Sequence, residues 1–343
     1  MSQDEREQVT PEHIFLSRRE FLKRAGFLLA GGLVLSACGG EATSAVPFSP
    51  TPRPTLPPGA GGQLVDEFGD PATPLTKIRA WGNYYEFTRS NEGIREAAQS
   101  LRAFPWEVRV DGLVRNPRTF DPDDLRRLGE EERIYRMRCM QAWSMVIPWL
   151  GLPLQKVLSA VEPTAEARWV RFEALYDPQQ MPGQDKNSPG YTQWLESGGQ
   201  RDMGGRSADA PYIWPYQEAL RLDEAMHDLT LLATGLYGQP LYPENGAPVR
   251  LVVPWKYSFK SIKAVVRIEL VAERPVTFWS HVAPEEMGFW ANVNPDVPTP
   301  RWKQGREMRM LGQDPEPIMS TLLFNGYAEV ASMYAGMDLR KDF

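Results

Sequence analysis

The sequence has few of the residues from which proteins build disulfides and metal sites. Only two cysteines, Cys38 and Cys139, occur in 343 residues, and the three histidines, His13, His227 and His281, lie far apart. No Cys-x-x-Cys pair, His-Glu-x-x-His motif or haem-attachment motif is present. Side chains alone therefore supply no zinc or iron–sulfur site, and no glycine-rich phosphate fingerprint is found.

Neither the charge nor the hydropathy of the chain indicates a nucleic-acid partner or a membrane span. The formal net charge is −6, whereas nucleic-acid-binding domains carry a basic face. The apolar run from Ala25 to Leu35 is broken by Gly31 and Gly32. It is also shorter than the ~20 residues that a spanning helix needs.

The N-terminus instead has the pattern of an export signal. Arg18 and Arg19 are followed by Phe-Leu-Lys and then by the short apolar run, which is typical of the twin-arginine route. That route exports folded proteins, often with a cofactor already bound. The run ends in Leu35-Ser36-Ala37-Cys38, similar to the lipobox of bacterial lipoproteins, so we expect acylation of Cys38. The alternative is an ordinary cleavage site with an incidental cysteine.

The composition divides the chain into three parts. Residues 1–38 form the predicted signal and lipobox. Residues 39–62 are rich in Pro, Ser, Thr, Ala and Gly, so they cannot bury a core and would act as an extended tether. Residues 63–343 have globular composition, and their length suits one large domain or two small ones, with many loops and much β structure.

Local patterns predict several elements of this domain. Strands are expected at Trp106–Val114, Arg133–Arg138, Arg168–Leu175, Val249–Val253 and Ile262–Val271, and helices at Asp121–Leu128, Leu154–Val161 and Pro215–Met226. The polar, Gly-rich stretch Gln179–Pro211 is expected to be a functional loop. The acidic pairs Asp223-Glu224 and Glu285-Glu286 are expected to be solvated helix faces.

Cys139 is the most informative residue, because it is the only thiol in the predicted mature domain. Arg136 and Arg138 precede it, and nearby cations favour the thiolate that binds metals or attacks electrophiles. The alternative is a small buried apolar residue, as free cysteines usually are. If Cys139 is a metal ligand, most of the other ligands must come from a cofactor.

Long motifs in matching order carry a family resemblance over nearly all of residues 63–343. They are Tyr85-Glu86-Phe87, Glu132–Cys139, Ala142–Val146, Gln180–Gln184, Leu220–His227, Asn245–Arg250, Val253–Tyr257 and Leu323–Ala328. In these segments the chain resembles the catalytic subunits of periplasmic protein-methionine-sulfoxide reductases, which are molybdoenzymes of the sulfite-oxidase fold.

The resemblance implies a mixed, β-rich α+β domain that holds one molybdenum–molybdopterin. It implies that the Cys139 thiolate ligates the metal, a soft ligand suited to it. The cofactor-binding residues that it implies are Asn83, Tyr85, Glu86, Cys139, Asn245, Arg250, Ser261, Ile262 and Lys263. Arg250 and Lys263 suit the pterin phosphate; without the resemblance they would be read as ordinary strand-edge cations.

Three positions depart from the relatives. Gly82 replaces an asparagine of the pterin site, and Ala174 replaces a threonine. Gln141 stands where a glutamate is common. Glutamine cannot give up a proton, so an acid role at this position is not expected.

The implied activity is oxygen-atom transfer from methionine sulfoxide, free or within oxidised envelope proteins, to reduced molybdenum. The cofactor carries the redox step. The resemblance also implies a haem-bearing membrane subunit that supplies electrons from quinol. The protein would act in the periplasm or at the outer face of the cytoplasmic membrane, anchored through Cys38.

Two alternatives stay open. One is an oxidative molybdoenzyme of the sulfite oxidase type; such enzymes usually carry a further dimerisation domain, for which we expect no room before Phe343. The other is a non-catalytic lipoprotein that retains the fold. The presence of Cys139 and of the segment Asn245–Arg250 argues against the second.

Overall fold

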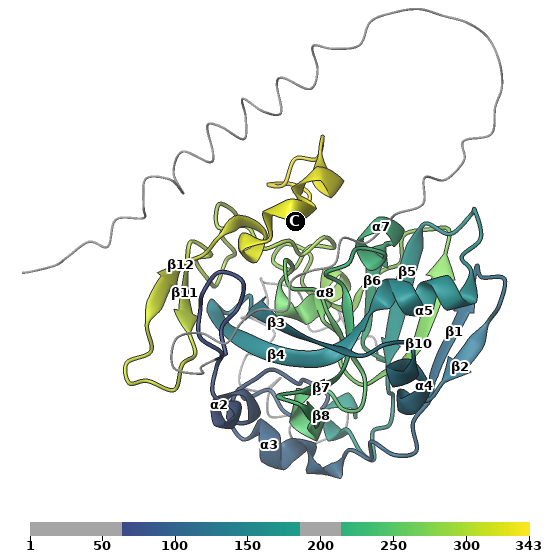
Figure 1. Ribbon diagram of the computed structural model, residues 1–343. Coiled ribbons are helices and arrows are strands. Elements are labelled where there is room, and N and C mark those ends of the chain that lie inside the picture. Colours follow the sequence, from purple (N-terminus) through teal and green to yellow (C-terminus); the bar gives the residue numbers. More distant parts are fainter. Residues whose placement is uncertain (1–63, 186–213) are drawn as a thin grey trace, which may run out of the picture. The chain divides into compact units, whose positions relative to one another are not determined.

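The computed structural model describes residues 64–185 and 214–343. The predicted export signal, lipobox and tether lie outside the described residues, as does most of the predicted loop at 179–211. Within the described residues, no helix is long and apolar enough to cross a membrane. This part of the chain consists of two β-sheets with short helices around them (Figure 1).

The first sheet has five strands in the order β2-β1-β10-β5-β6. Their bounds are β1 Val108–Gly112, β2 Arg118–Phe120, β5 Trp169–Ala174, β6 Gln217–Arg221 and β10 Val265–Val271. β1 runs parallel to β10, and the other neighbours are antiparallel. This sheet is therefore mixed.

The second sheet has seven strands, with β12-β11-β4-β7-β8 in order, β3 paired to β4 and β9 paired to β7. Their bounds are β3 Glu131–Arg138, β4 Trp143–Pro153, β7 Leu231–Leu236, β8 Gln239–Pro240, β9 Arg250–Val252, β11 Arg306–Arg309 and β12 Ile318–Ser320. β11 runs parallel to β4. Every residue of β7 is buried, and so is every residue of β4 except Leu150, so these two strands form the centre of the core.

The helices are short. The α-helices are α2 Leu75–Ala80, α3 Ile94–Ala97, α4 Pro122–Arg127, α5 Leu154–Val161, α7 Leu222–Ala225 and α8 Phe278–Val282. The 3₁₀ turns are η1 Ala98–Ser100, η2 Pro182–Gln184, η3 Pro243–Asn245, η4 Ser258–Lys260, η5 Leu323–Gly326 and η6 Ala328–Tyr334. With two mixed sheets and few helical residues, the described chain confirms the predicted β-rich α+β class.

Local signals explain the elements that the sequence predicted well. α4 begins after Asp121, whose Oδ1 accepts from the Asp124 N–H at 2.6 Å, while the Asp124 carboxylate accepts from the Asp121 N–H at 3.2 Å. This reciprocal cap and Pro122 at the first helical position define the helix start. Helix α5 and strands β1, β3, β5 and β9 also lie where the sequence predicted them.

The predicted helix at Pro215–Met226 is wrong over its first half. Residues Gln217–Arg221 form β6, which pairs with β5 along its whole length, and only Leu222–Ala225 is helical. Glu, Ala and Leu are good helix formers, but pairing with β5 buries three consecutive residues of β6. Tertiary pairing therefore overrides the local propensity.

Two further expectations need correction. The strand predicted at Ile262–Val271 begins only at Val265, because Ala264 has a φ of 49° and breaks the extended backbone. Glu224 and Glu286 are not solvated. Glu286 is 2% exposed and pairs with Arg301, and Glu224 is fully buried.

Glu224 forms a buried ion pair with Lys256 that joins distant segments. The Lys256 Nζ lies 2.6 Å from Glu224 Oε1 and donates to the carbonyl of Trp290 at 2.7 Å and to Asn292 Oδ1 at 3.0 Å. Tyr334 donates to the same glutamate oxygen. Burial lowers the pKa of Lys256 to about 8, against the opposing effect of Glu224, so the ammonium depends on these partners.

We predict that Lys256→Met lowers the free energy of unfolding by about 3–5 kcal/mol, because it leaves the Glu224 carboxylate buried without its cation. Urea denaturation followed by tryptophan fluorescence measures the change. The matched control is Arg127→Met, which removes a cation from the exposed pair with Asp124 and should change the midpoint little. An unchanged midpoint in Lys256→Met would contradict this account.

Candidate functional site

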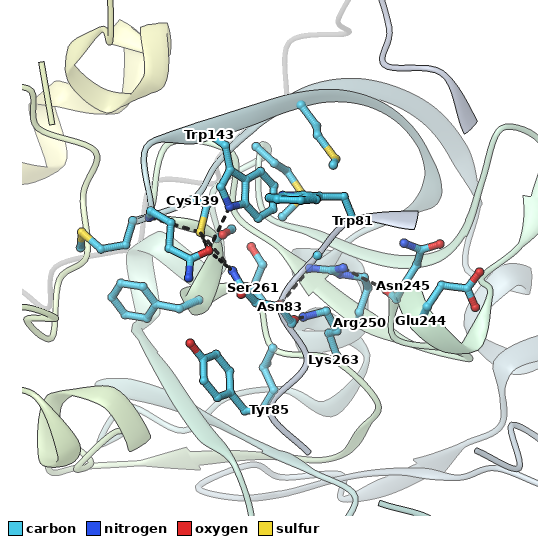
Figure 2. A pocket seen from close by; sticks show the side chains of 18 of the residues that line it. Trp81, Asn83, Tyr85, Cys139, Trp143, Glu244, Asn245, Arg250, Ser261 and Lys263 are labelled. Atoms are coloured by element: carbon cyan, nitrogen blue, oxygen red, sulfur yellow. Dashed lines mark hydrogen bonds between the residues drawn. The ribbon is translucent and has the colours of Figure 1, made fainter. Parts of the chain in front are cut away.

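The residues predicted for the cofactor surround one cavity. Figure 2 shows side chains that line it, with Cys139, Arg250 and Lys263 among those labelled. All nine predicted residues line it: Asn83, Tyr85, Glu86, Cys139, Asn245, Arg250, Ser261, Ile262 and Lys263. They come from four separate segments of the chain.

Cys139 lies at the tip of the hairpin formed by β3 and β4. The two strands pair without a break from Glu131 opposite Gly151 to Arg138 opposite Ser144. The hairpin closes with the Cys139 N–H donating to the Trp143 carbonyl at 2.8 Å. The predicted position of Cys139 at a strand end is therefore confirmed, and β3 projects the thiol into the cavity.

The two arginines do not make this thiol acidic, although Arg138 acts on its pKa in the expected direction. Arg136 pairs with Asp66 and Asp70, and Arg138 pairs with Glu307. Burial raises the pKa of Cys139, and the Gln141 N–H and the Arg138 charge only partly oppose it. The protein alone therefore favours the thiol, and a thiolate here needs a positive centre bound to its sulfur.

Gln141 is the shared acceptor of three side-chain donors beside the thiol. Its Oε1 accepts from Asn83 Nδ2 at 3.1 Å, Asn91 Nδ2 at 3.0 Å and Trp143 Nε1 at 3.1 Å. Asn83 Oδ1 in turn accepts from Asn91 at 2.6 Å, which turns its Nδ2 toward Cys139 Sγ, 3.3 Å away. The position requires an acceptor, which a glutamine supplies as a glutamate would.

Two cations, the buried Arg250 and the half-buried Lys263, face the same cavity without an ion-pair partner among the described residues. Arg250 is 4% exposed and donates only to carbonyls, those of Asn245 at 2.9 Å, Ser261 at 3.0 Å and Leu251 at 3.4 Å. Lys263 donates to the Asn83 carbonyl at 2.6 Å. Neither forms an ion pair with any described residue, although buried charges are normally paired.

The pKa shifts of these groups follow from their burial. Burial lowers the pKa of Arg250 to about 10. The pKa of Lys263 falls to about 7 through burial and through the nearby charge of Arg250, against the effect of Glu86. Burial raises the pKa of Glu86 to about 7 despite Lys263. A bound anion would stabilise both cations, so this part of the cavity is suited to a phosphate.

The other two departures from relatives differ in their consequences. Gly82 lines the cavity, and a Cβ there would meet only Ile94 Cδ1 at 3.8 Å. The glycine therefore leaves open space where a side chain would fit. Ala174 ends β5, is 1% exposed and does not line the cavity, so this replacement lies outside the site.

The sequence reasoning did not identify several residues of the site. Asn91 holds the amide of Asn83 through a hydrogen bond. The cavity is also lined by Trp81 and Glu244, and its apolar wall includes Trp143 and Trp302. Trp81, Trp143 and Glu244 each lie within four residues of a predicted site residue, which was the signal that could have found them. Trp302 comes from a segment far from Cys139 in the chain, so only the fold reveals that it is near.

The comparisons with known proteins agree with this site. Residues 96–279 match the sequence model of the oxidoreductase molybdopterin binding domain family. The match covers more than half of the chain, and the protein belongs to this family.

A similar solved structure is the sulfane dehydrogenase SoxCD from Paracoccus pantotrophus. It is 17% identical, with a TM-score of 0.38, and the match covers 72% of this chain. The chain spans 59% of the length of that protein. A likeness this distant carries no argument about substrate.

We predict that Gln141→Leu lowers the free energy of unfolding by about 1–3 kcal/mol, because it removes the acceptor of three N–H donors. Gln141→Glu keeps an acceptor and should retain wild-type stability. Thermal unfolding of cofactor-free protein compares them, with the exposed Gln99→Leu as control. If Gln141→Leu melts with the wild type, the network does not hold the site.

Proposed function

We propose that this protein is a molybdenum–molybdopterin-dependent reductase of methionine sulfoxide, free and protein-bound, in the cell envelope. The observation that carries the proposal is the arrangement of the cavity. One buried thiol lies in it together with two cations, the buried Arg250 and the half-buried Lys263, that have no ion-pair partner among the described residues. The family match supports a molybdopterin oxidoreductase, and the sequence resemblance supports the substrate.

The residues of the cavity fit the cofactor. Arg250 and Lys263 would hold its phosphate, which supplies the negative charge that both lack. Cys139 would ligate the metal, since a cation on its sulfur offsets the burial that raises its pKa. Asn245 and Ser261 would hold the pterin from the segments on either side of Arg250.

When bound, the cofactor supplies the two-electron chemistry that takes oxygen from a sulfoxide. The chain's own residues orient and enclose the reactants. Asn83, fixed by Gln141 and Asn91, donates toward Cys139 Sγ and limits rotation of that side chain. The cavity has an apolar wall formed by Met140, Trp143 and Trp302, which is suited to a methionine side chain.

Tyr85 would contribute a hydrogen bond to substrate oxygen. Burial raises the pKa of its phenol, and the neighbouring Cys139 adds to the rise, so the hydroxyl keeps its proton at neutral pH. It lines the same cavity as Cys139. The phenol can therefore donate a hydrogen bond to the sulfoxide oxygen.

A sulfite oxidase is the competing function, and the lining of the cavity disfavours it. A sulfite site needs several converging arginines, whereas Arg250 is the one arginine among the described lining residues. Arg301 precedes the lining residue Trp302, but its guanidinium is paired with the Glu286 carboxylate, at a nitrogen–oxygen distance of 2.5 Å. We therefore favour the reductive direction.

We predict that Cys139→Ser gives a folded protein whose methionine sulfoxide reduction falls by roughly 100-fold or more. Loss of a ligand should exceed the 10–100-fold cost of second-sphere changes. The assay uses a reduced viologen donor with free and protein-bound methionine sulfoxide, and sulfite with an artificial acceptor in parallel. Near-wild-type turnover in the mutant would contradict the ligand role. Efficient sulfite oxidation by wild type with inert sulfoxides would favour the competing function.

We also propose that the domain is tethered to a membrane through an acylated Cys38 and receives electrons from a haem-bearing, quinol-linked membrane subunit. The support is the twin-arginine signal, the lipobox-like Leu35–Cys38 and the proline-rich segment after it. Two or three acyl chains hold a protein firmly, at about 0.8 kcal/mol per buried CH₂.

We predict that Cys38→Ala releases the domain from the membrane fraction without changing turnover of small sulfoxides, because Cys38 lies far along the chain from the cavity. Fractionation and intact mass spectrometry measure this. Arg18→Lys with Arg19→Lys should instead retain the protein in the cytoplasm. A wild-type protein without lipid mass on Cys38 would exclude the anchor.

A further inference from the structure

Two adjacent residues of η3, Glu244 and Asn245, line the cavity on the side away from Cys139 (Figure 2). Both are buried, Glu244 being 2% and Asn245 8% exposed. Asn245 was predicted from the sequence as a cofactor residue, but Glu244 was not. Trp81, just after α2, lines the same cavity.

Each of these residues carries a shielded polar atom without a hydrogen-bond partner among the described residues. The atoms are Glu244 Oε2, Asn245 Oδ1 and Trp81 Nε1. A buried donor or acceptor left unpaired is costly, so native proteins rarely keep one without reason. Trp149 Nε1 is a fourth such atom in the lining of the cavity. Two unpaired acceptors and two unpaired donors together indicate a ligand that has both donors and acceptors.

The protein fixes the orientation of both acceptors. Asn245 Nδ2 donates to the Ile78 carbonyl at 3.1 Å, which leaves its Oδ1 as the free end of the amide. Glu244 Oε1 accepts from Arg79 Nε at 2.6 Å, which leaves Oε2 free. Arg79 itself lies over the ring of Tyr242, 3.8 Å from its centroid. The two acceptors are therefore held in place before any ligand binds.

We propose that Glu244 and Asn245 recognise the 2-amino-4-oxo-pyrimidine edge of the pterin, and that Trp81 donates to an acceptor on the same ring. This inference rests on the proposed function, which supplies the cofactor. That edge presents two neighbouring donors, the 2-amino group and N3–H, next to a carbonyl acceptor. These groups match Glu244 Oε2, Asn245 Oδ1 and Trp81 Nε1 in type. Arg79 acts as a positioning residue that neutralises and orients Glu244.

The charges in the cavity agree with a pterin edge at Glu244 and a phosphate at Arg250 and Lys263. A carboxylate repels phosphate, so the phosphate belongs with Arg250 and Lys263, whereas Glu244 suits a ring edge made of N–H donors. A hydrogen bond from a ring N–H to the free oxygen of the Glu244 carboxylate is also charge-assisted, and so stronger than one between two neutral groups. Glu244 would thus select a pterin over a ring that lacks the amino group.

The test measures how fast the purified holoprotein loses its cofactor. Molybdenum is followed by elemental analysis and pterin by the fluorescence of its oxidised product, in wild type, Glu244→Gln and Trp81→Phe. Glu244→Gln can keep the bond to Arg79 but can place an amide donor against the ring donors, so release should be roughly 10- to 100-fold faster. Trp81→Phe removes one neutral donor, and release should be about 2- to 10-fold faster.

The matched control is Glu316→Gln. Glu316 pairs with Lys77 on the same helix as Arg79, at 3.1 Å, but does not line the cavity, so its release rate should equal that of wild type. Melting of cofactor-free protein reports folding separately. If Glu244→Gln is destabilised there, Trp81→Phe decides, because Trp81 Nε1 has no protein bond to lose.

The outcomes separate this inference from the proposed function. If wild type holds molybdenum and pterin while Glu244→Gln and Trp81→Phe release them at the wild-type rate, the unpaired atoms bind only water and the inference is wrong. If wild type holds neither, the cofactor assignment and the inference both fail. Faster release from both variants, with an unchanged control, supports the inference.

Discussion

The antiparallel pairing of β3 with β4 is the constraint on which the site depends. Eight residue pairs hold the hairpin, and its closing bond fixes the backbone of Cys139. Arg138, fully buried, joins the base of this turn to Glu307 on β11 at 2.9 Å and to Thr321 at 3.2 Å. The thiol therefore projects from a rigid support, and the cavity forms where the other segments meet it.

Buried charges in this protein fall into two groups with different meanings. Lys256 with Glu224, Lys260 with Glu218 and Arg138 with Glu307 are paired, so they connect segments of the fold. Arg250, which is buried, and Lys263, which is half-buried, have no such partner among the described residues, and both line the cavity. Because an unpaired buried cation is costly without an anion, the second group identifies the ligand site.

The elements that could be predicted from the sequence have local causes. α4 carries its own cap, and the strand before Cys139 follows from its composition and length. The helix predicted over Gln217–Arg221 was wrong because pairing with β5, distant in sequence, decides the structure there. The burial of Glu224 was missed for the same reason, since Lys256 lies 32 residues further along the chain.

The site was predicted through motifs of a family, and the fold brings all nine of those residues to one cavity. What motifs could not supply was the arrangement around them. Asn91 and Glu244 act through hydrogen bonds to Asn83 and Arg79, from segments that only folding brings together. Arg138 favours the Cys139 thiolate as predicted, but burial of the thiol outweighs this effect, and the extent of burial cannot be read from the sequence.

The most direct test of the central claim is X-ray absorption at the molybdenum edge of the purified protein. We predict that molybdenum is present and that wild type has one more sulfur neighbour at bonding distance than Cys139→Ser. The same number of sulfur neighbours in both proteins, or no molybdenum in the wild type, would contradict the account.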